Sequence, residues 1–352
     1  MDSPEAGPSL AGVPRIAAPH ISLGEKTIQE RLARRTLALV LAGGRGSRLK
    51  QLTDFRSKPA VPFGGKFRIL DFTLSNCVNS GIRKIGVATQ YKAHSLIRHL
   101  QRGWNFLQPQ RNESFDILPA SQRVAEDAWY SGTADAVFQN IYTLQQDKPK
   151  YTLILSGDHI YQMNYMEMIQ FHVRRKADVT IGAVPMPIDV ASQFGVIQAD
   201  KSMNVVGFQE KPKRPASMPG DPHRAYVSMG NYIFTRDALL ESLAKSQRKR
   251  QHDFGAHVIP DLVDGGRVFA YDFASNVIPG TMPYEETGYW RDVGTISAFF
   301  DAHMDMLGEA PKFELDNRAW PIHPSGFEGP PTKILRGCAR GCADCVSCSA
   351  HA

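Results

Sequence analysis

The stretch that decides the fold runs from Thr36 to Lys50 and reads T-L-A-L-V-L-A-G-G-R-G-S-R-L-K. It opens with an unbroken apolar run, which predicts a buried strand. Three glycines and two arginines follow at once. A strand that leads into such a loop places backbone N–H groups and guanidinium groups at the carboxyl edge of a sheet, where phosphates bind. An ordinary tight turn is the alternative interpretation of the loop.

The loop residues that we expect to face phosphates are Gly43, Gly44, Arg45, Gly46 and Arg48. Glycine lets the backbone approach a ligand closely, and arginine pairs with phosphate oxygens through two N–H groups. The loop differs from two better-known phosphate loops. It lacks the Lys-Ser/Thr ending of a P-loop, and its glycines are spaced G-G-x-G instead of G-x-G-x-x-G.

Composition limits the class of protein. The chain has 352 residues, of which 42% are hydrophobic and 22% charged, as in a soluble globular protein with one large domain and appendages. The formal net charge of +6 suits anionic small molecules, and no basic stripe interleaved with aromatic residues indicates nucleic acid. No apolar run is long enough to span a membrane. Because the first 30 residues also lack the apolar segment of a signal peptide, we expect a cytoplasmic protein.

Strand and helix signals alternate between residues 36 and 185. They predict an α/β protein with a Rossmann-like, mostly parallel sheet covered by helices on both faces. After residue 190, shorter strand signals predict an antiparallel excursion that forms a substrate lid. The expected strands are Leu37–Leu41, Lys84–Thr89, Tyr151–Leu155, Val179–Val184, Gly195–Gln198, Val205–Glu210 and Gly230–Phe234. The expected helices are Phe72–Ser80, Ser95–Gln101, Ala134–Gln145, Arg236–Lys245 and Phe254–Val263.

Further side chains along the chain suit phosphate, sugar and metal chemistry. Lys58 follows the glycine loop closely enough to reach the same phosphates. Asp158 comes just after an expected strand, where one carboxylate together with substrate phosphates binds Mg²⁺. Glu210 and Lys211 end another strand and suit sugar hydroxyls and a phosphate, and Asp292 is a candidate second magnesium ligand. The alternatives are a basic surface turn, a helix cap at Asp158, a surface ion pair of Glu210 with Lys211, and a helix start after Asp292.

Cysteine use is uneven. Cys77 lies in an expected helix and is interpreted as a small buried apolar residue. The other four crowd into the last fifteen residues, at Cys338, Cys342, Cys345 and Cys348. Their C-x3-C-x2-C-x2-C spacing is typical of zinc or iron–sulfur ligands. The alternative is an aberrant tail that binds no metal.

Several motifs together resemble the sugar-phosphate nucleotidyltransferases, and more narrowly the bacterial ADP-glucose pyrophosphorylases, which are glucose-1-phosphate adenylyltransferases. The broader set is Ala42-Gly-Gly-Arg-Gly-Ser-Arg-Leu49, Lys58-Pro-Ala-Val-Pro62, Gly157-Asp158-His159 and Tyr289-Trp-Arg-Asp-Val-Gly-Thr295. The narrower set is Gly64-Gly-Lys-Phe-Arg68, Ser75-Asn76, Trp129-Tyr130-Ser-Gly-Thr-Ala-Asp-Ala136, Phe194-Gly-Val196 and Ser228-Met-Gly230. The resemblance covers roughly residues 36 to 335.

The resemblance implies the nucleotidyltransferase fold and an activity. ATP and glucose 1-phosphate would give ADP-glucose and pyrophosphate for glycogen (α-glucan) biosynthesis, with Mg²⁺ as cofactor. The chemistry agrees with the residues, because the attacking phosphate is already ionised and catalysis needs cations more than a nucleophilic side chain. Two alternatives stay open: a non-catalytic regulatory subunit or truncated pseudoenzyme that binds sugar phosphates, and a uridylyl or thymidylyl transferase of the same fold.

The resemblance also implies roles for individual residues. The catalytic residues would be Arg45, Lys58 and Asp158, and the magnesium ligands Asp158 and Asp292. The ATP-binding residues would be Gly43, Gly44, Arg45, Gly46, Arg48, Gln90, Pro119, Gln122, Gly132 and Thr133. The glucose 1-phosphate-binding residues would be Tyr130, Gly195, Glu210, Lys211 and Ser228.

The chain departs from the family pattern in two places. Phe55 stands where some relatives carry an activator-binding lysine, so fructose 1,6-bisphosphate is not the expected activator among sugar-phosphate or small-acid effectors. Relatives continue into a left-handed β-helix and form homotetramers, whereas this chain turns to its cysteine-rich ending. We therefore expect a flexible tail at residues 1–35, a catalytic domain at 36–310, a linker at 311–336 and an aberrant tail at 337–352, and family-type assembly is not expected.

Overall fold

The computed structural model describes residues 22–120 and 130–325. Its centre is a nine-stranded sheet with the strand order β10-β9-β11-β6-β1-β4-β5, in which β8 also pairs with β11, and β12 pairs with β8. The parallel part consists of β1 (Thr36–Ala42), β4 (Lys84–Thr89), β5 (Ser114–Pro119) and β6 (Tyr151–Ser156). The other part consists of β8 (Val179–Pro187), β9 (Gly195–Ala199), β10 (Val205–Glu210), β11 (Arg224–Thr235) and β12 (Val268–Asp272).

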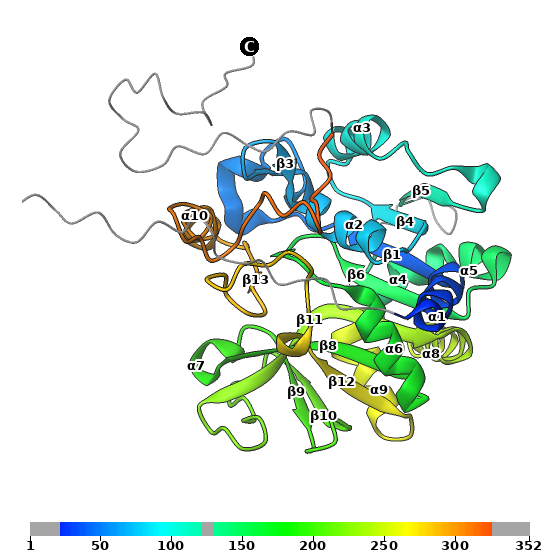
Figure 1. The fold of residues 1–352 in the computed structure, drawn as a ribbon. Helices are drawn as coiled ribbons and strands as arrows, with labels where there is room; N and C mark the ends of the chain where they lie inside the picture. The colour runs from blue at the N-terminus through cyan, green and yellow to red at the C-terminus, as the bar shows by residue number, and fades with distance from the viewer. Residues whose placement is uncertain (1–21, 121–129, 326–352) are drawn as a thin grey trace, which may run out of the picture.

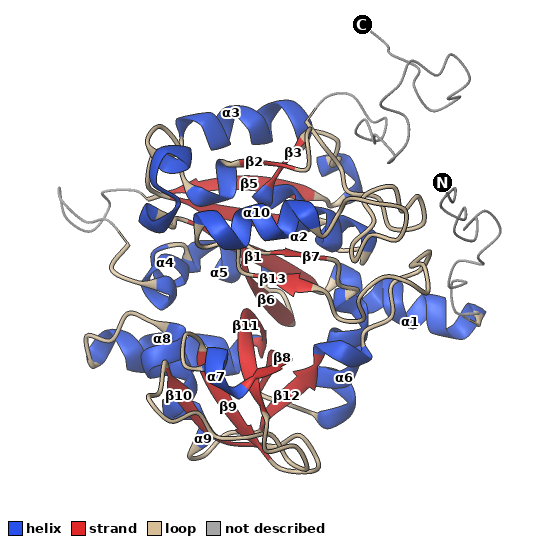
Figure 2. Cartoon of the chain, turned by 90° about the vertical axis from the view of Figure 1, so that its left-hand side faces the viewer, coloured by secondary structure: helices blue, strands red, loops and turns tan. Residues whose placement is uncertain are grey.

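The second part of the sheet is mainly antiparallel. Strand β11 pairs antiparallel with β6, β8 and β9, and β10 pairs antiparallel with β9, whereas β12 runs parallel to β8. Figure 2 shows β1 and β5 in the upper part of the molecule and β9, β10 and β12 in the lower part. The predicted fold class is confirmed: an α/β protein with a mostly parallel sheet and an antiparallel excursion.

Helices cover both faces of the sheet (Figure 1). Successive side chains of a strand point to opposite faces of the sheet, so β1 contributes to two hydrophobic cores. Ala38 and Val40 pack in one core with α2, α3 and α6. Leu37 and Leu39 pack in the second core with α4, α5 and α8. The helices are α1 (Leu23–Arg34), α2 (Ile69–Asn79), α3 (His94–Gly103), α4 (Thr133–Gln139), α5 (Ile141–Asp147), α6 (Tyr165–Arg175), α7 (Ile188–Ala191), α8 (Arg236–Arg248), α9 (Ile259–Val263) and α10 (Ile296–Met304).

Two short antiparallel strand pairs lie outside the main sheet. They are β2 (Pro62–Phe63) with β3 (Phe67–Arg68), and β7 (Ile160–Tyr161) with β13 (Trp290–Arg291). Five short turns complete the described elements: η1 (Ser47–Thr53), η2 (Lys58–Ala60), η3 (Pro109–Arg111), η4 (Phe254–Val258) and η5 (Phe273–Ser275). A third core, built around Phe63, Phe72 and Phe313, packs these loops against α10 and the segment after it.

The expectation of a flexible tail over 1–35 is wrong for α1. Ser22 accepts a hydrogen bond from the backbone of Glu25, and the Glu25 carboxylate accepts one from the backbone of Ser22, which closes a capping box. Ala33, near the end of the helix, is buried in the core. The predicted linker also packs closely in its described part, because Phe313, Trp320 and Ile322 are buried.

Other expectations need smaller corrections. The single helix predicted over Ala134–Gln145 is two helices, because the chain breaks at Asn140 between α4 and α5. Helix α6 and strands β5 and β12 were not predicted, whereas α10 begins where the alternative of a helix start after Asp292 placed it, with Thr295 as its cap. No helix in the described ranges is long and apolar enough to cross a membrane. The four C-terminal cysteines lie outside the described residues, and Cys77 is buried as expected.

Candidate active site

A cleft of about 820 Å³ opens at the carboxyl ends of β1 and β6. The two strands are parallel neighbours in which Leu41 pairs with Ser156, so the loops that follow them start side by side. The cleft brings together most of the predicted site residues: Gly43, Gly44, Gly46, Arg48, Lys58, Gln90, Tyr130, Gly132, Thr133, Asp158, Gly195, Glu210, Lys211, Ser228 and Asp292. Three predicted residues are not in its lining: Arg45, Pro119 and Gln122, the last of which lies outside the described residues.

The glycine loop crosses closely over Lys58. Gly46 has a φ of 65°, and a Cβ added there would lie 2.7 Å from the Cβ of Lys58. Glycine is therefore required at this position for two reasons, the left-handed backbone and the close approach. Arg45, by contrast, is exposed at the edge of the loop, with its guanidinium carbon 5.1 Å from the centre of the Tyr91 ring.

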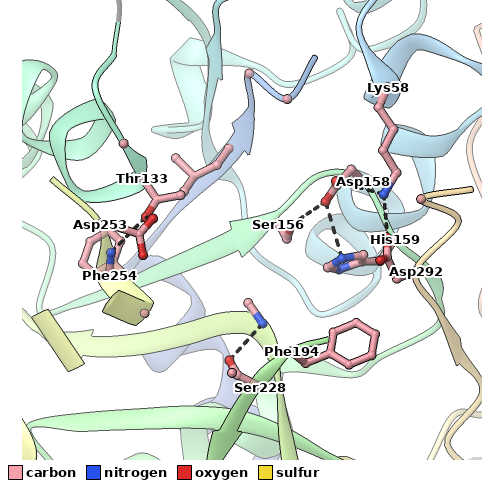
Figure 3. A pocket seen from close by; sticks show the side chains of 18 of the residues that line it. Lys58, Thr133, Ser156, Asp158, His159, Phe194, Ser228, Asp253, Phe254 and Asp292 are labelled. Carbon is pink, nitrogen blue, oxygen red and sulfur yellow. Dashed lines mark hydrogen bonds and ion pairs between the residues drawn. The ribbon is translucent and has the colours of Figure 1, made fainter. Parts of the chain in front are cut away.

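The centre of the cleft is a cluster of one ammonium group and two carboxylates. Lys58 Nζ lies 2.7 Å from Asp292 Oδ1 and 3.0 Å from Asp158 Oδ2. Lys58 is only 4% exposed, whereas both carboxylates keep some contact with solvent. Figure 3 shows the lysine reaching down between the two aspartates. The guanidinium of Arg48 lies farther out, 3.9 Å from Asp292 Oδ2.

Short elements hold these three side chains in place. Asp158 follows β6 and precedes β7, while Asp292 follows β13. Because β7 and β13 pair antiparallel, with Ile160 opposite Arg291, the two aspartates are brought together across 134 positions of sequence (292 − 158 = 134). Ser156 Oγ donates a hydrogen bond of 2.5 Å to Asp158 Oδ1, which fixes that carboxylate further.

Hydrogen bonds of Arg68 and Asp71 hold turn η2, which carries Lys58, in place. Arg68 Nη1 donates to Ala60 O at 2.6 Å, and the Arg68 backbone N–H donates to Asp71 Oδ2 at 2.7 Å. Asp71 is fully buried, and its other oxygen contacts His99 Nε2 at 2.7 Å and Trp104 Nε1 at 2.9 Å. A buried carboxylate with this many partners is well satisfied. Through these contacts Asp71 connects α2 with α3 and, by way of Arg68, with turn η2.

The cluster sets the charge of its members. Burial works against ionisation of Asp158, but the charges of Lys58 and His159 outweigh it and hold the pKa of Asp158 well below its ordinary value. Burial likewise opposes the charge on Lys58, while Asp158 and Asp292 raise its pKa overall. Burial lowers the pKa of His159 below its ordinary value, although the charge of Asp158 acts in the opposite direction. Asp158 and Lys58 are therefore a charged pair at neutral pH.

Opposite the glycine loop lies the proposed sugar side of the cleft. Lys211 has a φ of 47°, and its backbone N–H donates to Phe194 O at 3.0 Å. Its ammonium group lies 3.0 Å from Glu210 Oε1, and the lysine side chain is 65% exposed. A Cβ on Gly195 would lie 2.6 Å from the Phe208 ring and 3.0 Å from Glu210 Oε2, so this glycine makes room for both side chains. Ser228 lies just before a bulge in β11.

Tyr130 and Gln90 form a third group, beside the end of β4. Gln90 Nε2 donates to Tyr130 O at 3.4 Å. The Tyr130 hydroxyl donates to Leu118 O at 3.3 Å and accepts from Asn140 Nδ2 at 2.9 Å. The tyrosine predicted for the sugar phosphate is therefore hydrogen-bonded to β5, to Gln90 after β4 and to Asn140 between α4 and α5.

Some lining residues were not predicted to have a role, namely Ser156, His159, Gln193, Phe194, Tyr232, Asp253, Phe254 and Trp290. The His159 and Trp290 rings are 4.8 Å apart and the Phe194 and Trp290 rings 5.5 Å apart, which gives one end of the cleft an aromatic wall. Trp290 and Phe194 belong to recognised motifs, so their neighbourhood carried a signal. Asp253 follows the basic segment after α8, and nothing in its local sequence indicated a site.

The donor set of the cleft fits magnesium better than a closed metal site. Groups of three or more metal-ligating side chains are not found among the described residues. Asp158 and Asp292 are nevertheless close enough together to share one cation, the ammonium group of Lys58. Mg²⁺ is commonly held by one or two carboxylates, with its other ligands coming from water and substrate phosphates. Two carboxylates at the mouth of a phosphate loop match that pattern.

Comparison with known proteins agrees with this geometry. The nucleotidyl transferase family matches residues 37–309. A glucose-1-phosphate adenylyltransferase of Thermodesulfovibrio yellowstonii is 55% identical over 304 residues, covering 86% of this chain and 74% of the relative. Enzymes of the same name from Granulibacter bethesdensis and Mesorhizobium japonicum are 52% and 53% identical over 306 residues, covering 86% of this chain and 73% and 72% of their own lengths.

Proposed function

Since this chain belongs to the nucleotidyl transferase family, we propose that it transfers the adenylyl group of ATP to glucose 1-phosphate and releases pyrophosphate. The product, ADP-glucose, supplies glycogen (α-glucan) synthesis. Relatives more than half identical to this chain carry the corresponding enzyme name. The observation that carries the proposal is the charge cluster, in which Lys58 lies between Asp158 and Asp292 in a cleft that the glycine loop also lines.

The reaction is an in-line displacement at phosphorus. A phosphate oxygen of glucose 1-phosphate forms a bond to the α-phosphorus of ATP, and the bond to the oxygen that bridges the α- and β-phosphates breaks. Pyrophosphate leaves with that electron pair. No general base is required because the attacking phosphate is already ionised near pH 7, so the protein contributes alignment and positive charge.

We assign the residues on one side of the cleft to ATP and those on the other side to glucose 1-phosphate. The backbone of Gly43 to Gly46 can lie against the phosphates of ATP, with Gln90 toward the base. Lys58 would neutralise charge that develops on the phosphates, assisted by Arg48 in the cleft lining and by Arg45, which is exposed in the same loop. Glu210, Lys211 and Ser228 would hold glucose 1-phosphate on the opposite side.

Asp158 and Asp292 would hold Mg²⁺, which neutralises phosphate charge and draws the leaving group into line when it is bound. The two aspartates can also retain Lys58 until phosphates arrive, because its ammonium group already lies between them. The low pKa of Asp158, which follows from Lys58 and His159 outweighing its burial, keeps that carboxylate ionised throughout the neutral range. Phe55 is 85% exposed and carries no charge, so activation by fructose 1,6-bisphosphate is not part of the proposal.

The test is pyrophosphate release from the purified chain with glucose 1-phosphate and Mg²⁺, run in parallel with ATP, UTP and dTTP. We expect release with ATP to exceed release with either other nucleotide by at least tenfold in kcat/KM, roughly 1.4 kcal/mol of discrimination. A preference for UTP or dTTP would identify a transferase of the same fold with another base. Binding of glucose 1-phosphate without turnover of any nucleotide would identify a non-catalytic sugar-phosphate-binding protein.

A further inference from the structure

A hydrogen-bonded bridge crosses the cleft wall between the start of α4 and the segment 252–255. Thr133 Oγ1 donates to Asp253 Oδ2 at 3.0 Å and accepts from the backbone N–H of Phe254 at 2.9 Å. Figure 3 shows this group on the side of the pocket away from Lys58 and the two aspartates. One hydroxyl therefore holds both a side chain and the backbone of a segment 120 positions away.

Backbone contacts place the two segments at close range. The N–H groups of Ala134 and Asp135 both donate to His252 O, at 2.9 and 3.2 Å. A Cβ on Gly132 would lie 2.2 Å from the same carbonyl oxygen, so a side chain at that position would force the segments apart. Gly132 therefore allows the backbone of His252 to approach the start of α4 closely. This approach places Thr133 within hydrogen-bonding distance of Asp253 and Phe254.

The segment 252–255 continues into the sugar side of the cleft. The Phe254 ring lies 5.9 Å from the Tyr232 ring, and the Tyr232 hydroxyl accepts a 3.3 Å hydrogen bond from Ser228 Oγ. A Cβ on Gly255 would lie 2.9 Å from Glu210 Oε2, so the segment also lies directly against that carboxylate. Asp253 Oδ1 accepts from Ala256 N at 2.9 Å, which fixes the second oxygen of its carboxylate.

We propose that Thr133 is a positioning residue for the sugar-phosphate half of the cleft, which it orders through Asp253 and Phe254, and that its hydroxyl is not a ligand of ATP. This inference rests on the proposed function, in which glucose 1-phosphate lies beside Glu210 and Ser228. The hydroxyl has a single proton, and that proton is given to Asp253. Thr133, which the sequence placed among the ATP-binding residues, thereby determines the shape of the pocket for glucose 1-phosphate.

The experiment compares Thr133→Val with Thr133→Ser in the full chain. Valine keeps the shape and removes the hydroxyl, whereas serine keeps the hydroxyl. We expect Thr133→Val to raise KM for glucose 1-phosphate by about tenfold, the effect of losing one hydrogen bond to a charged group, with KM for ATP changed less than about twofold. Thr133→Ser should stay within about twofold of the parent for both substrates, since the bridge is retained.

A double-mutant cycle with Asp253→Ala shows whether Thr133 acts through Asp253. If it does, the effects of Thr133→Val and Asp253→Ala on KM for glucose 1-phosphate are strongly non-additive, because alanine removes the acceptor of a hydrogen bond that the valine variant has already lost. Melting temperatures of all variants show which proteins are folded, and the serine and Asp253→Ala variants keep the test decisive if the valine variant is unstable. Additive effects would overturn the proposal.

Two further results would also overturn it: a higher KM for ATP with an unchanged KM for glucose 1-phosphate, or no change in either constant on Thr133→Val. The parent chain separates this inference from the proposed function. If the parent turns over ATP and glucose 1-phosphate, the proposed function stands and only the role of Thr133 is at issue. If the parent neither turns over nor binds glucose 1-phosphate in a calorimetric titration, both proposals fail.

Discussion

Lys58 and Asp292 are separated by 234 positions in the sequence, yet the lysine Nζ lies 2.7 Å from the aspartate Oδ1. The contact joins the first loop region of the chain to the last β-pair that it forms, β7 with β13. Because Lys58 is buried and also reaches Asp158, this ion pair holds together the two carboxylates at the centre of the cleft.

Replacement of Lys58 by methionine should weaken the fold and change its response to metal. The variant keeps the length of the side chain but leaves two carboxylates without their shared cation, which should cost about 3 kcal/mol of unfolding free energy, the lower end for a broken buried pair. Urea unfolding without metal measures this cost. Added Mg²⁺ should then raise the melting temperature of Lys58→Met more than that of the parent, because the metal no longer competes with an ammonium group.

An equal or smaller response to Mg²⁺ in Lys58→Met would show that the lysine and the metal do not share a position. Lys50→Met is the matched control, since Lys50 is exposed and is not in the cleft lining. It should leave both the urea midpoint and the metal response within error of the parent.

Replacement of Asp158 by asparagine should abolish most turnover while the protein stays folded. The change removes one charge from the proposed metal site but keeps the shape of the side chain and its contact with Ser156. We expect kcat to fall by at least about 100-fold, with a smaller effect on ATP binding measured by calorimetry. Near-normal kcat at saturating Mg²⁺ would contradict the metal assignment.

Replacement of Lys211 by alanine should act on one substrate. Its exposed ammonium group is proposed to hold the phosphate of glucose 1-phosphate, and losing one charge-assisted hydrogen bond should raise KM for that substrate roughly 10- to 150-fold. KM for ATP should be nearly unchanged and kcat modestly lower. Lys213→Ala is the neighbouring control, because Lys213 is exposed but outside the cleft lining. If Lys211→Ala behaves like this control, the lysine only forms a surface ion pair with Glu210.

His172 should make the protein less stable in mild acid. Its ring is fully buried, with Nδ1 2.8 Å from Thr180 Oγ1 and Nε2 without a hydrogen-bond partner, and burial lowers its pKa from 6.5 to about 4. Between these two values the unfolded chain binds a proton that the folded chain does not, so unfolding becomes easier as pH falls from 6.5 toward 4. The loss from this one group should be about 2–3 kcal/mol.

Urea unfolding at pH 7 and pH 4.5 tests this prediction, with His172→Gln as the comparison. The variant cannot gain a proton at this position, so its stability should fall less between the two pH values, even if it is less stable at pH 7. An identical fall in the two proteins would show that His172 does not titrate on unfolding.

Much of the parallel part of the fold was predictable because its signals are local. The apolar run before the glycine loop, the strands at Lys84–Thr89 and Val205–Glu210, and the antiparallel turn of the later sheet all appear as predicted. Helix α1 was missed because its residues are mostly polar, and its start depends on a capping box within an otherwise unpatterned segment. The start of α10 agrees with the alternative of a helix start after Asp292, since Thr295 caps it, but its extent gave no clear signal because Phe300 and Met304 remain exposed.

The sequence by itself determined which chemical groups this protein has to work with: the glycine loop, the basic residues after it, and carboxylates at the ends of strands. Each of these groups lies within a short contiguous motif, and neighbouring residues largely determine the local backbone conformation of such a motif. The tertiary structure alone decided how the groups meet. The pairing of β7 with β13 sets Asp292 against Lys58, and the close approach of residue 252 to α4 gives Thr133 a partner 120 positions away. Such contacts depend on strand register and backbone packing between distant segments, and no stretch of neighbouring residues encodes them.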